Sequence, residues 1–178
     1  SAGTHKGLTA KVQILNMDAS VAWEKEATVD SNEDTTNKCI KLAFPANLSK
    51  VHFIKMVLTE NGKVVSDNFY HRSLEENNYQ DLRQLAKVAL QSTTTVDKNA
   101  DGTWSAVSVI ENKTSTPALM IRLNVVGSKD GQQLLPVFYS DNYFSLLPGE
   151  KKEVRMSWKD EDTRGNEGKV LITGYNVE

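Results

Sequence analysis

The chain has 178 residues, and its 21 Lys and Arg against 23 Asp and Glu give a formal net charge of -2. This near balance excludes the strong basic or acidic field that a nucleic acid or an anionic membrane would need in a partner. No apolar run approaches the roughly 20 residues of a membrane span. We therefore expect no nucleic acid and no membrane among its partners. The length fits one large or two small domains with a buried core.

The chain starts with "SAGTHKG", which lacks the basic-then-apolar pattern of a signal peptide. Such a start is more typical of a processed end, or of a domain cut from a longer protein, than of a translation start. We therefore interpret the chain as part of a longer parent protein. A periplasmic or secreted parent is compatible with this start.

Metal-ligating residues are few. Cys39 is the single cysteine, so an intrachain disulfide and a cysteine-based metal cluster are both excluded. Its strand-like surroundings, "NKCIKLAF", predict an ordinary buried or half-buried thiol. The histidines His5, His52 and His71 are too scattered for a local metal motif. We expect neither a metal nor a cofactor.

Short runs rich in Val, Ile, Leu, Thr and aromatic residues, separated by Gly, Asn and Asp, predict strands in the first part of the chain. The "ENGK" at 60–63 is the best hairpin signal, because Asn-Gly readily adopts the two positive φ angles of a tight turn. The predicted strands cover residues 8–15, 22–30, 36–44, 51–60 and 63–70.

The pattern changes at 72–86, where Tyr79, Leu82 and Leu85 have helical spacing and predict a short helical connector. Strand signals then resume without alternating helices, which favours antiparallel sandwiches over a parallel α/β sheet. The second set of predicted strands covers residues 87–98, 103–113, 119–128, part of 135–154, 152–158 and 169–177.

The predicted fold class is therefore all-β, with two immunoglobulin-like antiparallel β-sandwiches joined by the connector. The first domain covers residues 1–71 and is the thinner sandwich, with room for further strands upstream. The second domain covers residues 72–178. Trp104 and Trp158 each lie in an alternating apolar run, so we expect both to pack in the core.

The segment "DKNADG" at 97–102 matches the opening of a calcium loop. However, its twelfth position is Ser108 instead of a bidentate glutamate, and strands flank it where the motif requires helices. We therefore interpret it as a polar hairpin tip.

Catalytic motifs are absent from the sequence. There is no G-x-S-x-G elbow and no phosphate-binding glycine loop. The acidic groups Glu75-Glu76 and Asp160-Glu161-Asp162 are adjacent residues, whereas glycoside hydrolysis needs two carboxylates fixed across a cleft. We therefore expect these acids to be solvated and the chain not to be an enzyme by itself.

The run "VFYSDNYFSLL" at 137–147 places four aromatic rings around "SDN". If the strand is continuous, Phe138 and Phe144 point inward and Tyr139 and Tyr143 point to the other side. We expect "SDN" to interrupt the strand as a turn or bulge. Tyr139, Asp141, Asn142 and Tyr143 are candidates for contacts with another domain or with a sugar, since a phenol can be half buried with its hydroxyl still in water.

Two segments, "YSDNYFSLLPGE" and "DTRG" followed by "GYNV", resemble the C-terminal immunoglobulin-like domain of glycoside hydrolase family 2 enzymes, in the branch of exo-β-D-glucosaminidases and β-mannosidases. The stretch "SDNFYHRSLEENNYQDLRQLAKVAL" resembles the junction that precedes this domain. The resemblance implies a noncatalytic accessory region of a glycosidase whose partners are the catalytic (β/α)₈ barrel and other domains of the parent chain, and glycans as further candidates. No position here matches the family's catalytic motifs.

The role of Arg164 and the function of the chain each have alternative interpretations. Arg164 either braces the loop backbone together with Asp162, or anchors another domain or a ligand. The chain could instead be a carbohydrate-binding module with Trp23, Trp104 or Tyr143 as a stacking platform, or a structural or adhesion sandwich of its own.

Overall fold

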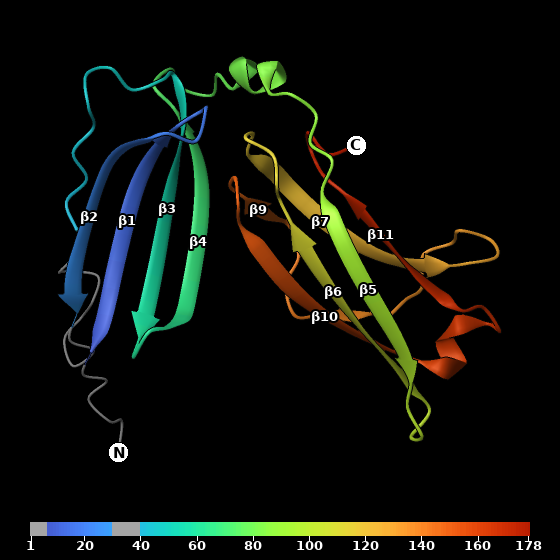
Figure 1. Cartoon of the computed structure of the whole chain (residues 1–178). Coiled ribbons are helices and arrows are strands. Elements are labelled where there is room, and N and C mark those ends of the chain that lie inside the picture. Colours follow the sequence, from blue (N-terminus) through green and yellow to red (C-terminus); the bar gives the residue numbers. More distant parts are fainter. Residues whose placement is uncertain (1–6, 30–39) are drawn as a thin grey trace. The chain divides into compact units, whose positions relative to one another are not determined.

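A computed structural model describes residues 7–29 and 40–178. The chain divides into two compact units, residues 1–84 and 85–178 (Figure 1). The described elements are antiparallel strands and two short 3₁₀ helices. The all-β class predicted from the sequence is therefore confirmed.

The first unit contains one four-stranded antiparallel sheet in the order β2-β1-β3-β4 (Figure 1). The predicted hairpin is confirmed, because Asn61 and Gly62 take φ angles of 50° and 79° between β3 and β4. The strands are β1 (Leu8–Asn16), β2 (Val21–Val29), β3 (Val51–Glu60) and β4 (Lys63–Ser73).

The second layer expected for this domain is not among its described residues. Of the strand predicted over 36–44, residues 36–39, including Cys39, lie outside the described part of the chain. Residues 40–44 form no strand, so that prediction is wrong over its described part. Both faces of the sheet nevertheless carry buried side chains, with Ile14 on one face and Phe53 on the other, each at 0% exposure.

The connector is mostly irregular. Its only regular element is the 3₁₀ helix η1 (Gln80–Gln84), in which Leu82 is buried. The Tyr79 ring meets the His71 ring edge-on, with centroids 5.1 Å apart, so the connector packs back on β4. The division at residue 84 groups the connector with the first unit, whereas the sequence prediction begins the second domain at residue 72.

The second unit is a sandwich of a four-stranded sheet, β5-β6-β10-β8, and a three-stranded sheet, β11-β7-β9. A short 3₁₀ helix, η2 (Asp160–Thr163), follows β10. The strands are β5 (Gln91–Lys98), β6 (Thr103–Glu111), β7 (Ala118–Gly127), β8 (Phe138–Tyr139), β9 (Phe144–Leu146), β10 (Lys151–Lys159) and β11 (Gly168–Thr173).

The core of this sandwich lies between the two sheets. Alternate residues of β6 and β10 point inward in register, as the pairs Ala106–Met156 and Trp104–Trp158 show. Burial of each large apolar side chain contributes about 1.5–3 kcal/mol to folding. The core placement predicted for Trp158 is confirmed at 3% exposure, while Trp104 is only half buried and packs at the edge of the cluster.

Candidate functional site

The aromatic segment crosses from one sheet to the other. β8 pairs with β10, whereas β9 pairs with β7 in the opposite layer. The predicted interruption at "SDN" is confirmed, but Phe138 is 66% exposed and only Phe144 is buried. The inward orientation predicted for Phe138 is therefore wrong. The change of sheet at 140–142 breaks the strand's alternation, so that Tyr139 takes the inward position beside Met156.

Two of the candidate side chains complete the open edge of β7. Asn142 accepts a hydrogen bond from the Leu123 N–H through Oδ1 at 2.7 Å and donates from Nδ2 to the Leu123 carbonyl at 3.0 Å. The Tyr139 hydroxyl accepts a hydrogen bond from the Val125 N–H at 3.0 Å. These backbone groups would otherwise lack a strand partner, because β9 pairs with β7 only at Ala118 and Ile121. Tyr139 and Asn142 therefore hold the two layers together.

Asp141 and Tyr143 face outward. Asp141 forms an ion pair with Lys152, whose ammonium lies 4.7 Å from the centre of the Phe144 ring. Tyr143 is 67% exposed, and the Arg122 guanidinium lies 5.7 Å from its ring centre. Tyr143 also has a φ of 57°, a left-handed conformation that is costly for a residue with a Cβ. Of the four candidate residues in this segment, Asp141 and Tyr143 are therefore the exposed ones.

Arg164 lies apart from this cluster. It ends η2 with a φ of 51°, and its side chain is exposed. The turn is closed by the Thr163 hydroxyl, which donates to the Asp160 carbonyl at 2.7 Å, and by the Asn166 N–H, which donates to the Thr163 carbonyl at 2.9 Å. Lys152 is seven residues before the end of β10, which is roughly 23 Å along an extended strand. The structure thus does not bring Arg164 to Asp141.

Trp104 is held by an acidic residue. Its Nε1–H donates to Asp160 Oδ1 at 2.7 Å, and Lys98 donates to Asp160 Oδ2 at 2.9 Å while lying 5.4 Å from the Trp104 ring centre. The hydrogen bonds from Trp104 and Lys98 hold the pKa of Asp160 below its ordinary value. Covered and hydrogen-bonded in this way, Trp104 is not an open stacking platform.

The hairpin predicted over 97–102 is confirmed. The Asn99 N–H donates to the Thr103 carbonyl at 2.8 Å, and Asp101 Oδ1 accepts from the Thr103 hydroxyl at 2.6 Å and from its N–H at 3.0 Å. The bonds from Thr103 lower the pKa of Asp101. The Asp101 carboxylate therefore stabilises the turn through its hydrogen bonds with Thr103.

The described part of the chain has neither a cluster of metal ligands nor a membrane-spanning helix. Across residues 7–29 and 40–178, His, Cys, Asp and Glu side chains form no group of three or more that could hold a metal ion. In the same ranges, neither 3₁₀ helix has the length or apolar character needed to cross a membrane.

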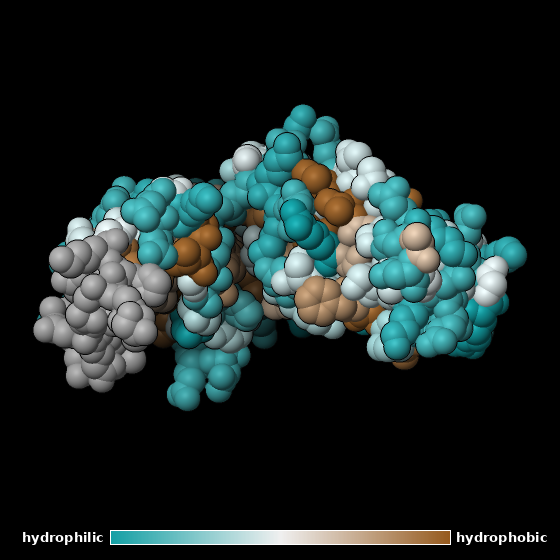
Figure 2. Space-filling view, turned by 90° about the horizontal axis from the view of Figure 1, so that it is seen from below, coloured by the Kyte–Doolittle hydropathy of each residue, from teal (hydrophilic) through white to brown (hydrophobic). Residues whose placement is uncertain are grey.

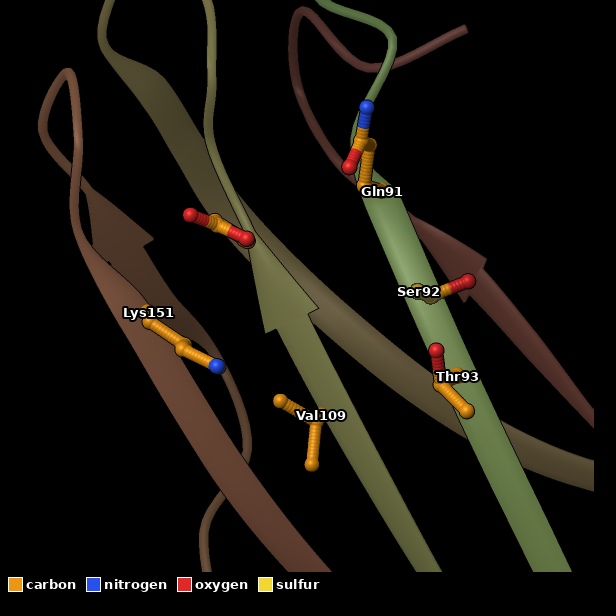
Figure 3. Close-up of a pocket in the computed structure, with 6 residues that line it drawn as sticks. Gln91, Ser92, Thr93, Val109 and Lys151 are labelled. Atoms are coloured by element: carbon orange, nitrogen blue, oxygen red, sulfur yellow. The ribbon is translucent and has the colours of Figure 1, made fainter.

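A polar depression of about 360 Å³ lies over one end of β5, β6 and β10 (Figure 3). Side chains from three strands line it, and Glu111 is its single carboxylate. Hydrolysis of a glycosidic bond requires two carboxylates that flank the bond. This depression therefore lacks the arrangement of a glycosidase centre. Its lining residues are Gln91, Ser92, Thr93, Val109, Glu111 and Lys151.

The first unit carries a larger and mostly apolar depression, of about 530 Å³, that sequence reasoning missed. Its residues come from the 40–45 segment, two strands and the residue after β4, so no local sequence pattern marks them. Figure 2 shows that hydrophobic residues reach the surface of the molecule in separate patches among hydrophilic ones. The depression is lined by Leu42, Phe44, His52, Ile54, Met56, Tyr70, Arg72, Ser73 and Leu74.

The second unit is thus an immunoglobulin-like sandwich. The polar side chains described above form hydrogen bonds with its own strand edges and turns, as is typical of an accessory domain. A family model described as the exo-beta-D-glucosaminidase Ig-fold domain matches residues 68–177. The chain belongs to this family. The resemblance noted in the sequence to glycoside hydrolase family 2 exo-β-D-glucosaminidases is therefore confirmed.

Curated relatives agree. The chain is 30% identical to an exo-beta-D-glucosaminidase of Streptomyces avermitilis over 96% of its own length and 22% of that protein. It is also 30% identical to an exo-beta-D-glucosaminidase of Hypocrea jecorina, over 94% of the chain and 21% of the relative. The chain therefore spans about a fifth of the length of the relatives it matches.

A solved structure extends the match to the fold. A crystal structure of the exo-chitosanase of Amycolatopsis orientalis superposes with a TM-score of 0.85 at 25% identity. That match covers 99% of this chain and 23% of the other. In that exo-chitosanase, the counterparts of both units therefore lie within a much longer polypeptide.

Proposed function

We propose that the chain is the noncatalytic, C-terminal accessory region of a family 2 glycoside hydrolase with exo-β-D-glucosaminidase activity, and that it supports a catalytic barrel carried elsewhere in the parent. The observation that carries this proposal is the match to relatives of that name over 96% of the chain but only 22% of the relative. The remaining four-fifths of such a protein has ample room for a barrel of about 250 residues.

The state of the carboxylates supports a noncatalytic role. A general acid for glycoside hydrolysis needs a raised pKa, so that it is protonated near neutral pH. Among the described residues, Asp18, Asp101 and Asp160 have lowered pKa values, because hydrogen bonds favour their charged forms. Each of these bonds comes from a neighbouring turn or strand residue, which is a structural use of the carboxylate.

Turnover assays test this proposal. The 178-residue chain is expected to release no product from aryl β-glucosaminides or aryl β-mannosides, and the full-length parent is expected to hydrolyse the glucosaminide. Turnover by the isolated chain that a point mutation within it abolishes would contradict the noncatalytic role. A parent without glucosaminidase activity would contradict the assignment of the enzyme.

The carbohydrate-binding alternative has weaker support. A flat binding face needs exposed rings on one surface, but Trp23 is partly buried in the first unit and Trp104 is bound to Asp160 on the inner face of its sheet. Tyr143 lies just before β9, a strand of the other sheet. Within the second unit, Trp104 and Tyr143 therefore do not share one open face. Calorimetry with glucosamine oligosaccharides is expected to show no heat of binding.

A further inference from the structure

We infer that the apolar depression of the first unit is a docking surface for an apolar surface of the parent polypeptide that lies outside these 178 residues. This inference rests on the proposed function, because it assumes that the chain works as part of a longer protein. It adds to that function by naming the residues that attach the accessory region to the rest.

The exposed walls of the depression are apolar. Phe44 is 53% exposed, Met56 43%, Tyr70 40% and Leu74 61%. Two of these residues lie on adjacent strands, Met56 on β3 and Tyr70 on β4, while Phe44 and Leu74 come from the segments that flank the sheet. Four large side chains gathered around one depression form a continuous patch, in contrast to the single exposed apolar residues common on any surface.

His52 and Arg72, the two basic side chains of the lining, already make contacts within the unit. His52 Nδ1 lies 3.2 Å from the Ser49 carbonyl, and the His52 ring meets Phe44 edge-on. Arg72 donates to the His71 carbonyl at 3.1 Å and lies 5.2 Å from the Tyr70 ring centre. A sugar needs several free donors and acceptors for its hydroxyl groups. This depression instead offers hydrocarbon and ring faces, which fit the apolar side chains of a protein.

The identity of the partner follows from the length of the relatives. About four-fifths of each matched protein lies outside the aligned region. A partner on the same polypeptide is present at a high effective concentration, so a modest apolar patch is enough to hold it. A second copy of this chain would need a larger buried interface, of about 800 Å² on each partner.

Methionine oxidation tests the inference with an internal control. Met56 in the depression and Met120 on β7 have nearly equal exposure in this chain, 43% and 41%. In the full-length protein treated with dilute peroxide, we expect Met56 to be oxidised at least tenfold more slowly than in the same protein unfolded in urea. In the 178-residue chain we expect Met56 and Met120 to react at similar rates.

Three outcomes would overturn the inference. The first is a Met56 rate in the native full-length protein within threefold of the unfolded rate. The second is slow oxidation of Met56 in the isolated chain at every dilution, which would place the occupant within these residues. The third is slow oxidation that disappears on dilution, which would identify a second copy. Glucosaminidase activity of the same full-length sample reports separately on the proposed function.

A charge variant provides an independent measurement. In the full-length protein, Met56→Glu combined with Leu74→Glu is expected to increase cleavage between the accessory region and the rest by at least fivefold in limited proteolysis. The control is Val64→Glu, which changes another apolar residue of β4 that is 61% exposed but lies outside the depression. Equal cleavage of the double variant and the control would contradict the docking surface.

Discussion

The side-chain amide of Asn142 forms with Leu123 the same pair of hydrogen bonds that a residue of a neighbouring strand would form. Oδ1 takes the place of a strand carbonyl at 2.7 Å, and Nδ2 takes the place of a strand N–H at 3.0 Å. This relationship explains why a polar residue is present in the middle of an aromatic run. β9 pairs with β7 only at Ala118 and Ile121, and opposite Leu123 the asparagine side chain takes the place of a strand residue.

Asn142→Ala is expected to destabilise the second unit by about 1–3 kcal/mol, because both Leu123 backbone groups lose their partner in a partly buried place. Urea unfolding of the chain measures the free-energy change. Gln133→Ala removes an exposed amide from the same unit and is expected to change stability by less than about 0.5 kcal/mol. Equal stability of the two variants would show that the Asn142 amide is dispensable.

Strand positions were predicted well where periodicity and turn chemistry agree. The prediction for 51–60 coincides with β3, and Asn61 and Gly62 adopt the positive φ angles expected of the turn. The predicted strand 152–158 lies within β10, whose alternation faces a single core. In these elements the local sequence contains the signals that determine the structure.

Long-range relationships were not predictable from the sequence. The orientation of Phe138 depends on which sheet β8 joins, and that choice is made by its partner strand β10. The apolar depression likewise combines Phe44 with Met56 and Tyr70, residues far apart in the chain whose proximity follows only from the order of strands. Asn176 illustrates the same limit, because it falls in the strand predicted over 169–177 but lies beyond the end of β11 at Thr173, where it is 2% exposed and binds the backbone of Ala86, Pro117 and Leu119.

Stability at acid pH is expected to depend on Asp160. Because its pKa is lower in the folded chain than in the unfolded chain, its hydrogen bonds with Trp104 and Lys98 stabilise the fold fully above the unfolded pKa of about 4. This stabilisation is lost as the pH falls through the folded pKa. The Asp160→Asn variant is therefore expected to have a lower free energy of unfolding than the unsubstituted 178-residue chain at pH 6. The difference should shrink towards pH 2.5.

The control for this titration is Asp162→Asn, which removes the same charge from the same turn. Urea midpoints measured across pH 2.5–6 for the three proteins give the comparison. If the stability difference between the Asp160→Asn variant and the unsubstituted chain stayed constant with pH, the predicted linkage would be contradicted.

Gly168 is expected to tolerate no side chain. A Cβ at this position would lie 2.5 Å from Cζ2 of Trp158, a rigid ring atom in the core. Gly168→Ala should therefore destabilise the second unit by about 1–3 kcal/mol through overpacking. Trp158→Phe removes the clashing part of the ring, together with a buried Nε1–H that has no hydrogen-bond partner among the described residues.

The two changes are thus expected to couple. The double variant should be at least about 1 kcal/mol more stable than the sum of the single effects predicts. Thermal or urea unfolding of the four proteins completes the cycle, and Lys169→Ala controls for a change at the exposed neighbour. Additive changes in the free energy of unfolding would mean that the backbone at residue 168 shifts away from the Trp158 ring, so that the added Cβ does not clash with it.

Arg164→Gly separates the two roles considered for this residue. Its φ of 51° is left-handed and strains any residue with a Cβ, so glycine should keep the stability of the chain or raise it by up to about 1 kcal/mol. The matched control is Lys159→Gly at the other end of η2, where φ is -90° and glycine should cost about 0.5–1 kcal/mol. If Arg164→Gly instead destabilises the chain by more than about 1 kcal/mol in urea unfolding, the Arg164 side chain braces the loop. If stability is kept, the exposed guanidinium is free to contact another part of the parent protein.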